Sequence, residues 1–240
     1  MNLNSETFGP IRRVLAMGGL AVAAAAALSG CGFLDDAGTD TDEGEVSNAQ
    51  LDAAGDASPG DCLPEEVLAS DGKTFAVDCS GAEAFWTITA IEADPGVTAS
   101  GGDIADTQAI YDVCGTEVGA QLPGKPWTDW NMIYDQTTGS VDYLFCVEAI
   151  DQPNAEGVVP VVPSAAGECF SSAEWNFGTF PCDSPAVDST VVQVVEIDQA
   201  EWETVDAETV AMEQCTGDDW TYYIGAVDQF GRTAAVYCTN

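Results

Sequence analysis

Basic residues are almost absent from this chain of 240 residues. Five Lys and Arg stand against 41 Asp and Glu, histidine is missing, and the formal net charge is −36. Because contacts to phosphate depend on Lys and Arg, we expect neither a nucleic-acid partner nor a docking surface for anionic lipid headgroups. We interpret the acidity as a source of solubility and mutual repulsion. Adaptation to a saline habitat and diffuse binding of divalent cations are the alternatives. The basic residues are Arg12, Arg13, Lys73, Lys125 and Arg232.

Recognisable catalytic groups are missing as well. Without histidine the chain forms no Ser-His-Asp or Cys-His arrangement and no histidine metal site. A Gly-x-Ser-x-Gly motif and a phosphate-binding glycine loop are also absent. Paired carboxylates serve glycosidases, but acidic residues are so numerous here that any chosen pair would be arbitrary. The sequence therefore predicts a protein that is not an enzyme, with no cofactor and no dedicated metal site.

One long apolar run is present, from Val14 to Leu28, directly after two arginines. At about 15 residues it is short for a membrane span, which needs roughly 20, and it fits the core of an export signal. The run leads into Leu-Ser-Gly-Cys ending at Cys31, which matches the bacterial lipobox. The sequence therefore predicts lipidation of Cys31 and an anchor in the cell membrane, made by several acyl chains. A transmembrane helix with a chance cysteine is the alternative, and the arginine pair leaves both the Sec and the Tat export routes open.

The segment after Cys31 is rich in Asp, Glu, Gly, Ala, Ser and Thr and lacks a sustained apolar period. We interpret residues 32–58 as a disordered, extended tether. Residues 40–45 resemble a calcium loop only superficially, because the fifth-position ligand and the sixth-position glycine are missing. Disorder throughout the chain is not expected, since 46% of the residues are apolar.

The remaining eight cysteines fall into two sets of four with similar spacing, which indicates an internal duplication. In an exported chain an even number of cysteines predicts disulfides. Zinc binding is not expected, because no C-x-x-C pair is present. Within each set we expect the first cysteine to pair with the second and the third with the fourth. First with fourth and second with third is the rival. The expected pairs are Cys62–Cys79, Cys114–Cys146, Cys169–Cys182 and Cys215–Cys238. The predicted organisation is a signal peptide (1–30), a lipidated acidic tether (31–58), module 1 (59–150), a Pro-containing linker (151–165) and module 2 (166–240).

Each module is predicted to be an α+β unit, a mainly antiparallel sheet with one helix. In module 1 the pattern favours strands at 74–79 and 85–92 and a helix from Asp103 or Asp106 to about Val118. A hairpin follows, with strands at 131–134 and 141–149. In module 2 the corresponding elements are a strand at 189–197, a helix at 206–214 capped by Asp206, and a hairpin of 221–227 with 232–239. Disulfides suit modules of this size, which are near the lower limit for one stable core.

Two clusters of aromatic residues occupy matching places, just before or at the start of each hairpin. The functional interpretation is a surface patch on which a sugar or peptide stacks. The alternative is that one or more of the rings fill a small core. The candidate binding residues are Trp127, Trp130, Trp220 and Tyr222.

The pattern of lipobox, Gly-Asp/Glu-Cys, a second cysteine, a helical cysteine and a last strand ending in cysteine resembles a known family. It is similar to the septum-formation-related and LppU-like lipoproteins of actinobacteria, over residues 60–147 and 167–239. Members usually carry Pro-His after the second cysteine. Here only Pro185 matches, so no role of that histidine carries over. The resemblance implies an anchored surface protein linked to the cell envelope and to septum formation, and it implies no particular activity.

These observations predict a lipid-anchored protein on the extracytoplasmic face of the cell membrane, used for interaction or scaffolding. Its expected partners are the membrane, through the lipid on Cys31, and an envelope protein or wall polymer that the sequence does not identify. The alternative is a divalent-cation-dependent protein that binds cell-wall polysaccharide or peptide.

Overall fold

The computed structural model describes residues 15–17, 48–65, 76–100, 103–135, 137–154, 157–172, 177–217 and 219–240. Cys31, most of the predicted signal peptide and the first part of the predicted tether therefore lie outside the described residues. Within the described ranges, no helix is both long and apolar enough to cross a membrane.

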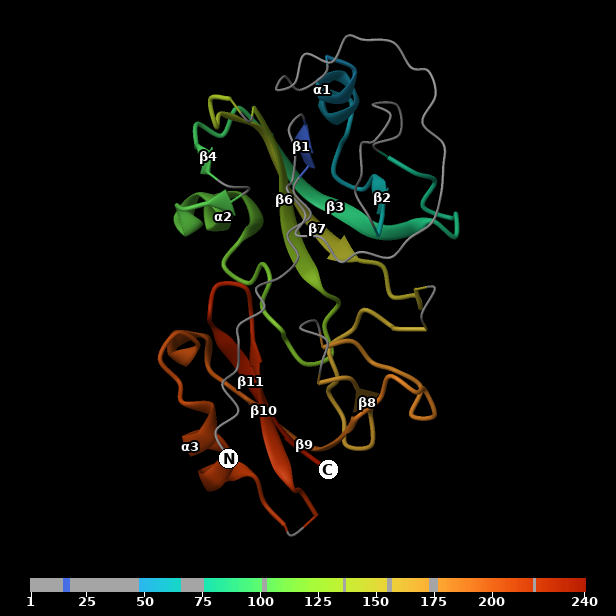
Figure 1. Cartoon of the computed structure of the whole chain (residues 1–240), viewed down its shortest axis with the longest axis vertical. Coiled ribbons are helices and arrows are strands. Elements are labelled where there is room, and N and C mark those ends of the chain that lie inside the picture. The colour runs from blue at the N-terminus through green and yellow to red at the C-terminus, as the bar shows by residue number, and fades with distance from the viewer. Residues whose placement is uncertain are drawn as a thin grey trace, which may run out of the picture.

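Module 1 is built on a five-stranded sheet with the order β1-β6-β7-β3-β2 (Figure 1). All neighbouring strands are antiparallel except β1 and β6, which are parallel. β1 lies inside the predicted signal peptide, so cleavage before Cys31 would leave β6 as the edge strand. The elements of module 1 are β1 (Leu15–Met17), α1 (Asn48–Gly55), β2 (Cys62–Pro64), β3 (Ala84–Ala93), β4 (Ala99–Ser100), β5 (Asp103–Ile104), α2 (Thr107–Cys114), β6 (Thr128–Asp135) and β7 (Val141–Ala149).

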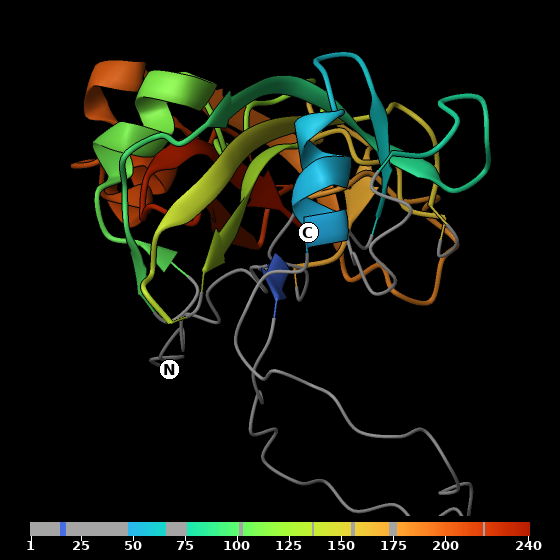
Figure 2. The same cartoon turned by 90° about the horizontal axis from the view of Figure 1, so that it is seen from above.

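Module 2 repeats this topology with a four-stranded sheet of order β10-β11-β9-β8. β8, β9, α3, β10 and β11 therefore correspond to β2, β3, α2, β6 and β7, which agrees with the predicted duplication and α+β class. Figure 2 shows α2 and α3 on the same side of the two sheets. The elements of module 2 are β8 (Cys169–Phe170), β9 (Ser189–Glu196), the short 3-10 helix η1 (Gln199–Glu201), α3 (Ala207–Gln214), β10 (Tyr222–Val227) and β11 (Thr233–Thr239).

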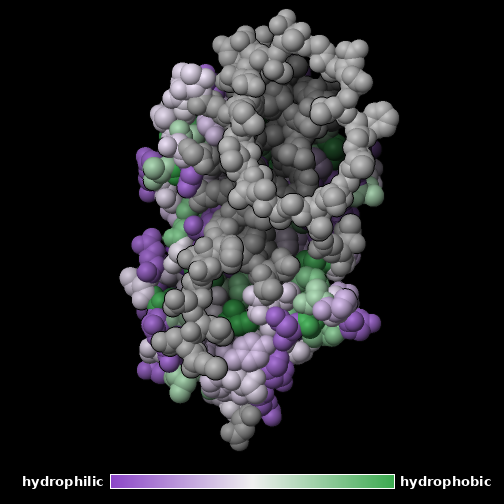
Figure 3. Space-filling view, viewed as in Figure 1, coloured by the Kyte–Doolittle hydropathy of each residue, from purple (hydrophilic) through white to green (hydrophobic). Residues whose placement is uncertain are grey.

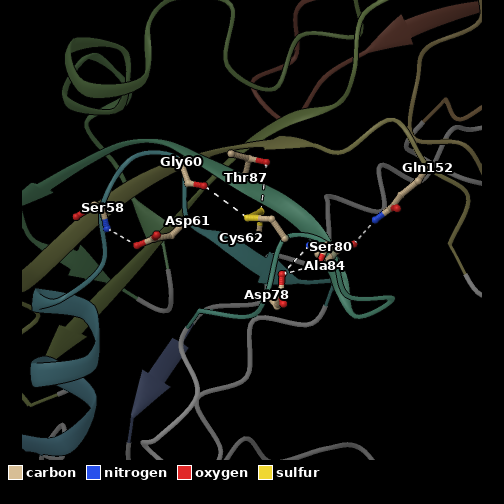
Figure 4. The surroundings of a disulfide bond; sticks show 10 residues. Ser58, Gly60, Asp61, Cys62, Asp78, Ser80, Ala84, Thr87 and Gln152 are labelled. Atoms are coloured by element: carbon tan, nitrogen blue, oxygen red, sulfur yellow. Dashed lines mark hydrogen bonds between the residues drawn. A yellow bond between two sulfur atoms is a disulfide. The ribbon is translucent and has the colours of Figure 1, made fainter.

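Four disulfides join the pairs that the cysteine spacing predicts, Cys62–Cys79, Cys114–Cys146, Cys169–Cys182 and Cys215–Cys238. The first disulfide of each module has similar surroundings. Cys62 lies 3.9 Å from the Thr87 hydroxyl, and Cys169 lies 3.8 Å from that of Thr190 (Figure 4). The second disulfide of each module links the helix to the last strand. Cys114 ends α2 and Cys215 follows α3, and their partners lie in β7 and β11.

The sheets are buried on both faces, because alternate side chains of the central strands enter different clusters. On β7, Phe145 and Val147 join the cluster that contacts α1, whereas Leu144 packs with Ile110 of α2. On β11 every residue is buried. Tyr237 faces the cluster that contains Val162 of the linker, and Val236 faces α3.

The predicted tether is wrong for its last part, because residues 48–55 form the helix α1. Leu51 and Ala54, three positions apart, face the core of module 1, and Ala54 is fully buried. Two apolar side chains are too few to give a clear helical period in the sequence. They stabilise the helix in the folded chain because they pack against a face of the sheet. The predicted tether therefore does not extend through residues 48–55, and residues 32–47 lie outside the described residues.

Three elements of module 1 differ from those predicted. The first hairpin strand begins at Thr128 and not at residue 131, so Trp130 lies within β6. The helix of module 1 ends at Cys114 and not near Val118, because Gly115 has a φ of +83° that a continuing helix does not allow. The strand at 74–79 is represented by one bridge between Val77 and Cys62, and its first two residues lie outside the described residues.

Candidate binding cleft between the modules

The linker joins the modules through backbone hydrogen bonds. Val161 bridges Pro126 of module 1, and Val159 bridges Thr179 of module 2. The Val162 N–H donates to Lys125 O at 3.0 Å. The predicted extended linker thus forms isolated β-bridges with a segment of each module, so it restricts how the modules move relative to each other.

Trp127, one of the four predicted binding residues, also spans the junction. Its indole Nε1 donates to the carbonyl of Phe177 at 3.1 Å. The ring packs against the core clusters of both modules. The half-buried ring therefore acts as a structural contact between the modules.

The other three predicted residues are not brought together. Trp130 is 7% exposed and lies in the core beside α2, as the core interpretation expects. Trp220 is half-buried and packs against the cluster below α3. Tyr222 is 37% exposed, and its hydroxyl donates to Asp188 O at 2.9 Å and lies 2.9 Å from Ser189 Oγ. A shared aromatic patch therefore does not form, and Tyr222 is the one whose ring reaches the surface.

The strongest contact between the modules is made by Arg232, at the end of the β10–β11 turn. Its side chain is buried and forms an ion pair with Asp228, with 2.6 Å between Nη2 and Oδ2. Its Nη1 donates to Thr116 O at 2.5 Å and its Nη2 donates to Val118 O at 2.7 Å. Both carbonyls belong to the segment after α2, so one guanidinium connects a turn of module 2 to the backbone of module 1 (Figure 1, where the red hairpin reaches towards the green helix).

Three aromatic rings surround this guanidinium. Its Cζ atom lies 5.0 Å from the ring centres of Tyr111 and Phe230 and 5.4 Å from that of Trp202. Cation–π contact of this kind favours arginine over lysine, because the planar guanidinium can stack and donate several hydrogen bonds at once. We call the set Asp228, Arg232, Thr116 and Val118 the inter-module latch.

Two polar contacts flank the latch. Gln229 Nε2 donates to Asp129 Oδ1 at 3.1 Å, and Gln199 Nε2 donates to Thr116 Oγ1 at 3.0 Å. Together with the linker, they hold the two modules in one relative orientation.

A cleft of about 460 Å³ lies beside the latch, with one wall from each module. This volume is within the range of small-ligand sites, which often lie at domain interfaces. Tyr111 and Phe230 meet across the junction, with ring centres 5.3 Å apart and an edge-on arrangement. The lining residues are Asp103, Ile104, Ala105, Thr107, Gln108 and Tyr111 from module 1, and Glu203, Gln229 and Phe230 from module 2.

The electrostatics of the cleft are negative. Asp103 and Glu203 supply a carboxylate from each wall, and none of the lining residues is basic. Burial is the main reason that the pKa of Tyr111 is raised, Arg232 opposes this, and Asp228 and Glu203 add to it. Tyr111 therefore stays a neutral hydroxyl at physiological pH. Figure 3 shows hydrophilic residues along the margins of the face seen in Figure 1.

Little in the sequence indicates this site. In sequence, Asp228-Gln229 before Gly231 repeats Asp135-Gln136 before Gly139, which indicates duplication and not a site. The one usable signal is Arg232, the only arginine after the predicted signal peptide, in a chain with few basic residues.

Within the described part of the chain, no group of three or more Cys, Asp or Glu is arranged to hold a metal ion. The divalent-cation alternative is thus left without a built site in these residues. Comparison of the chain with protein-family models, curated proteins and solved structures finds no match.

Proposed function

We propose that this protein is a lipid-anchored, extracytoplasmic binding protein whose two modules act as one rigid unit and recognise an envelope component without catalysing a reaction. The observation that carries the proposal is the inter-module latch. A buried ion pair that also binds two carbonyls of the other module is costly to form unless its geometry is fixed. A rigid junction keeps the two walls of the cleft in place, which lowers the entropy cost of binding.

The location is supported by the four disulfides, because such bonds persist in oxidising compartments outside the cytoplasm. The lipid anchor rests on the lipobox at Cys31. The proposed link to septum formation rests on the family resemblance alone.

The anchor is tested by membrane fractionation of the full chain and of the Cys31→Ser variant. We expect the wild type in the membrane fraction and the variant no longer processed to the lipidated form. If lipid labelling and membrane retention are the same in both, the anchor is wrong.

The rigid unit is tested by capture of envelope components on the wild type and on Arg232→Met, with limited proteolysis to check that each module stays folded. Partner capture should fall when the junction is loosened while both modules persist. Unchanged capture by a variant with separated modules would refute the two-module unit.

A further inference from the structure

We propose that the outer edge of β6 is a peptide-binding site. It receives an extended apolar segment of another envelope protein as an added strand, parallel to β6. The inference goes beyond the cleft and rests on the proposed processing at Cys31. Because cleavage before Cys31 removes β1, the edge that β1 occupies becomes available to a partner in the mature protein.

The first argument is the strand that the structure shows on this edge. β1 pairs in parallel with the last three residues of β6, and Ala16 lies opposite Tyr134 (Figure 1). Strand addition draws its affinity from main-chain hydrogen bonds, so another segment of similar shape can take the same place. β10 is the equivalent edge strand of module 2, and no described strand pairs with its outer side. Occupation by a further strand is therefore a property of the β6 edge and not of both modules.

The second argument is the direction of the main-chain groups at the end of β6. The Asp135 N–H donates to Ser140 O at 2.9 Å, within the hairpin that β6 forms with β7. Because neighbouring N–H groups of a strand point to opposite sides, the Tyr134 N–H points away from β7. The register then implies that the Tyr134 N–H meets the carbonyl of residue 15 and that the Tyr134 carbonyl meets the N–H of residue 17. Removal of β1 leaves these two groups of Tyr134 without their strand partner.

The rest of the edge is closed by side chains of β6 itself. The Trp130 N–H donates to Asp129 Oδ1 at 2.8 Å, and the Met132 N–H donates to Asn131 Oδ1 at 2.9 Å. Side chains that bond the main chain in this way compete with a ladder and protect an edge from pairing. Strand addition is therefore confined to the end of β6, which is the stretch that β1 occupies.

The third argument separates a peptide partner from a second copy of this chain. Two copies that each carry a net charge of −36 would repel each other at close range. The segment that does occupy the edge is Leu-Ala-Met, and it follows Arg12 and Arg13 in the sequence. The chemistry that fits is therefore a short apolar segment with basic residues before it.

The probe is a fluorescent synthetic peptide of residues 12–18, Arg-Arg-Val-Leu-Ala-Met-Gly. It is titrated into the processed protein in neutral detergent, after mass spectrometry has shown whether the signal peptide is removed. The processed protein should bind the peptide, as measured by fluorescence anisotropy. The Cys31→Ser chain keeps its signal peptide, so its own β1 competes at a high effective concentration. We expect this variant to bind the peptide at least about tenfold more weakly.

Two N-methylated peptides test the ladder without changing the protein. Methylation of the N–H of the Met at position 17 removes the donor that faces the Tyr134 carbonyl, so binding should weaken at least about tenfold. Methylation of the N–H of the Ala at position 16 is the matched control, because that N–H points away from β6 in this register. The control should change binding less than about twofold, since the two peptides have the same composition and charge.

Hydrogen exchange at assigned amides reports on the protein side of the contact. The peptide should slow exchange at the Tyr134 amide of the processed protein. The Met132 amide is the internal control, because it is already bonded to Asn131 and should not change.

Three results would overturn the proposal. Equal binding of the two N-methylated peptides would mean that charge or apolar surface holds the probe and that no ladder forms. Unchanged exchange at Tyr134 on saturation with the peptide would place the contact elsewhere. Absence of peptide binding by a protein whose signal peptide has been removed would show that the edge does not accept a strand.

These failures differ from failure of the proposed anchor. A wild-type protein that keeps its signal peptide would contradict both the anchor and the opening of the edge. Equal binding of the N-methylated pair by a correctly processed and anchored protein would contradict the edge alone.

Discussion

The two hairpin turns show how one local design serves two purposes. In module 1, the Asp135 carboxylate accepts hydrogen bonds from the N–H groups of Thr137 and Thr138. In module 2, Asp228 accepts from the N–H groups of Phe230 and Arg232. Each turn has a glycine with positive φ, +77° at Gly139 and +80° at Gly231. Both turns thus combine an aspartate side chain with a glycine, but the turn of module 1 is one residue longer, since the Gly139 N–H donates to Asp135 O and the Gly231 N–H donates to Asp228 O.

The side chains after the aspartate make the difference. Module 1 has Thr138 and Ser140 where module 2 has Phe230 and Arg232. The first turn packs on its own module, where the Ala99 N–H donates to Gly139 O at 2.7 Å. The second turn crosses to the other module. The residues on either side of Gly231, Phe230 and Arg232, are therefore the ones that make the contact with the other module.

The largest effect should come from Arg232→Met. The change leaves Asp228 buried without its partner and two carbonyls without donors, so we expect a loss of about 3–5 kcal/mol in the free energy of unfolding. The equivalent change in module 1, Ser140→Ala, should cost less than about 0.5 kcal/mol because that side chain is exposed. Denaturant unfolding of both variants measures the contrast, and similar losses would refute the assigned role of the latch.

Trp130 and Tyr223 form the next pair, since they lie opposite Cys146 and Cys238 in the two sheets. Trp130 is 7% exposed, so Trp130→Ala should cost about 3–4 kcal/mol through the cavity it leaves. Tyr223 is half-buried, and Tyr223→Ala should cost clearly less. If Trp130→Ala instead kept its melting temperature and lost only ligand binding, the surface-patch interpretation would return.

The two turn glycines, Gly139 and Gly231, differ in the space around them. At Gly231 an added Cβ meets nothing within 4 Å, so Gly231→Ala should cost only the strain of positive φ, about 1–2 kcal/mol. At Gly139 the same atom would lie 2.6 Å from Ala99 O, so Gly139→Ala adds a backbone clash. Its cost should be larger by about 1–3 kcal/mol. Thermal unfolding of the two variants decides the order.

The smallest effect concerns Asp206, the N-cap of α3. Hydrogen bonds from the hydroxyl and the N–H of Thr209 lower the pKa of Asp206 below its usual value of 3.8. The folded state therefore binds a proton less readily than the unfolded state. The resulting stabilisation is present above about pH 4 and is lost as pH falls through the folded pKa.

Asp206→Asn should keep the cap at neutral pH, since Asn also caps helices well, and should flatten the stability profile at acidic pH. The profile of the wild type between about pH 2 and pH 5 is the reference. A variant with the same acid slope as the wild type would show that other carboxylates control it.

Much of each module could be predicted from sequence because its contacts are short in sequence and marked by residue type. Cysteine order indicated the pairs, valine-rich alternation indicated β9, and Asp206 marked a helix start. The helix α1 could not be predicted, because two small apolar residues among acids give no period, and its stability comes from the sheet on which it packs. The predicted aromatic binding residues were ambiguous for the same reason, because a local sequence pattern does not show whether a ring is exposed or packed in the core.

The cleft required the tertiary structure. The bonds from Arg232 to Thr116 and Val118 span 116 and 114 residues, and the cleft combines residues from Asp103 to Phe230. By itself, the sequence determined the acidity, the duplication, the lack of histidine chemistry and the expected disulfide staples. These depend on composition and on spacing within one module. Only the tertiary structure decided the relative orientation of the modules, the burial of Arg232 and the cleft lined by both modules. These features depend on which surfaces of the two modules meet.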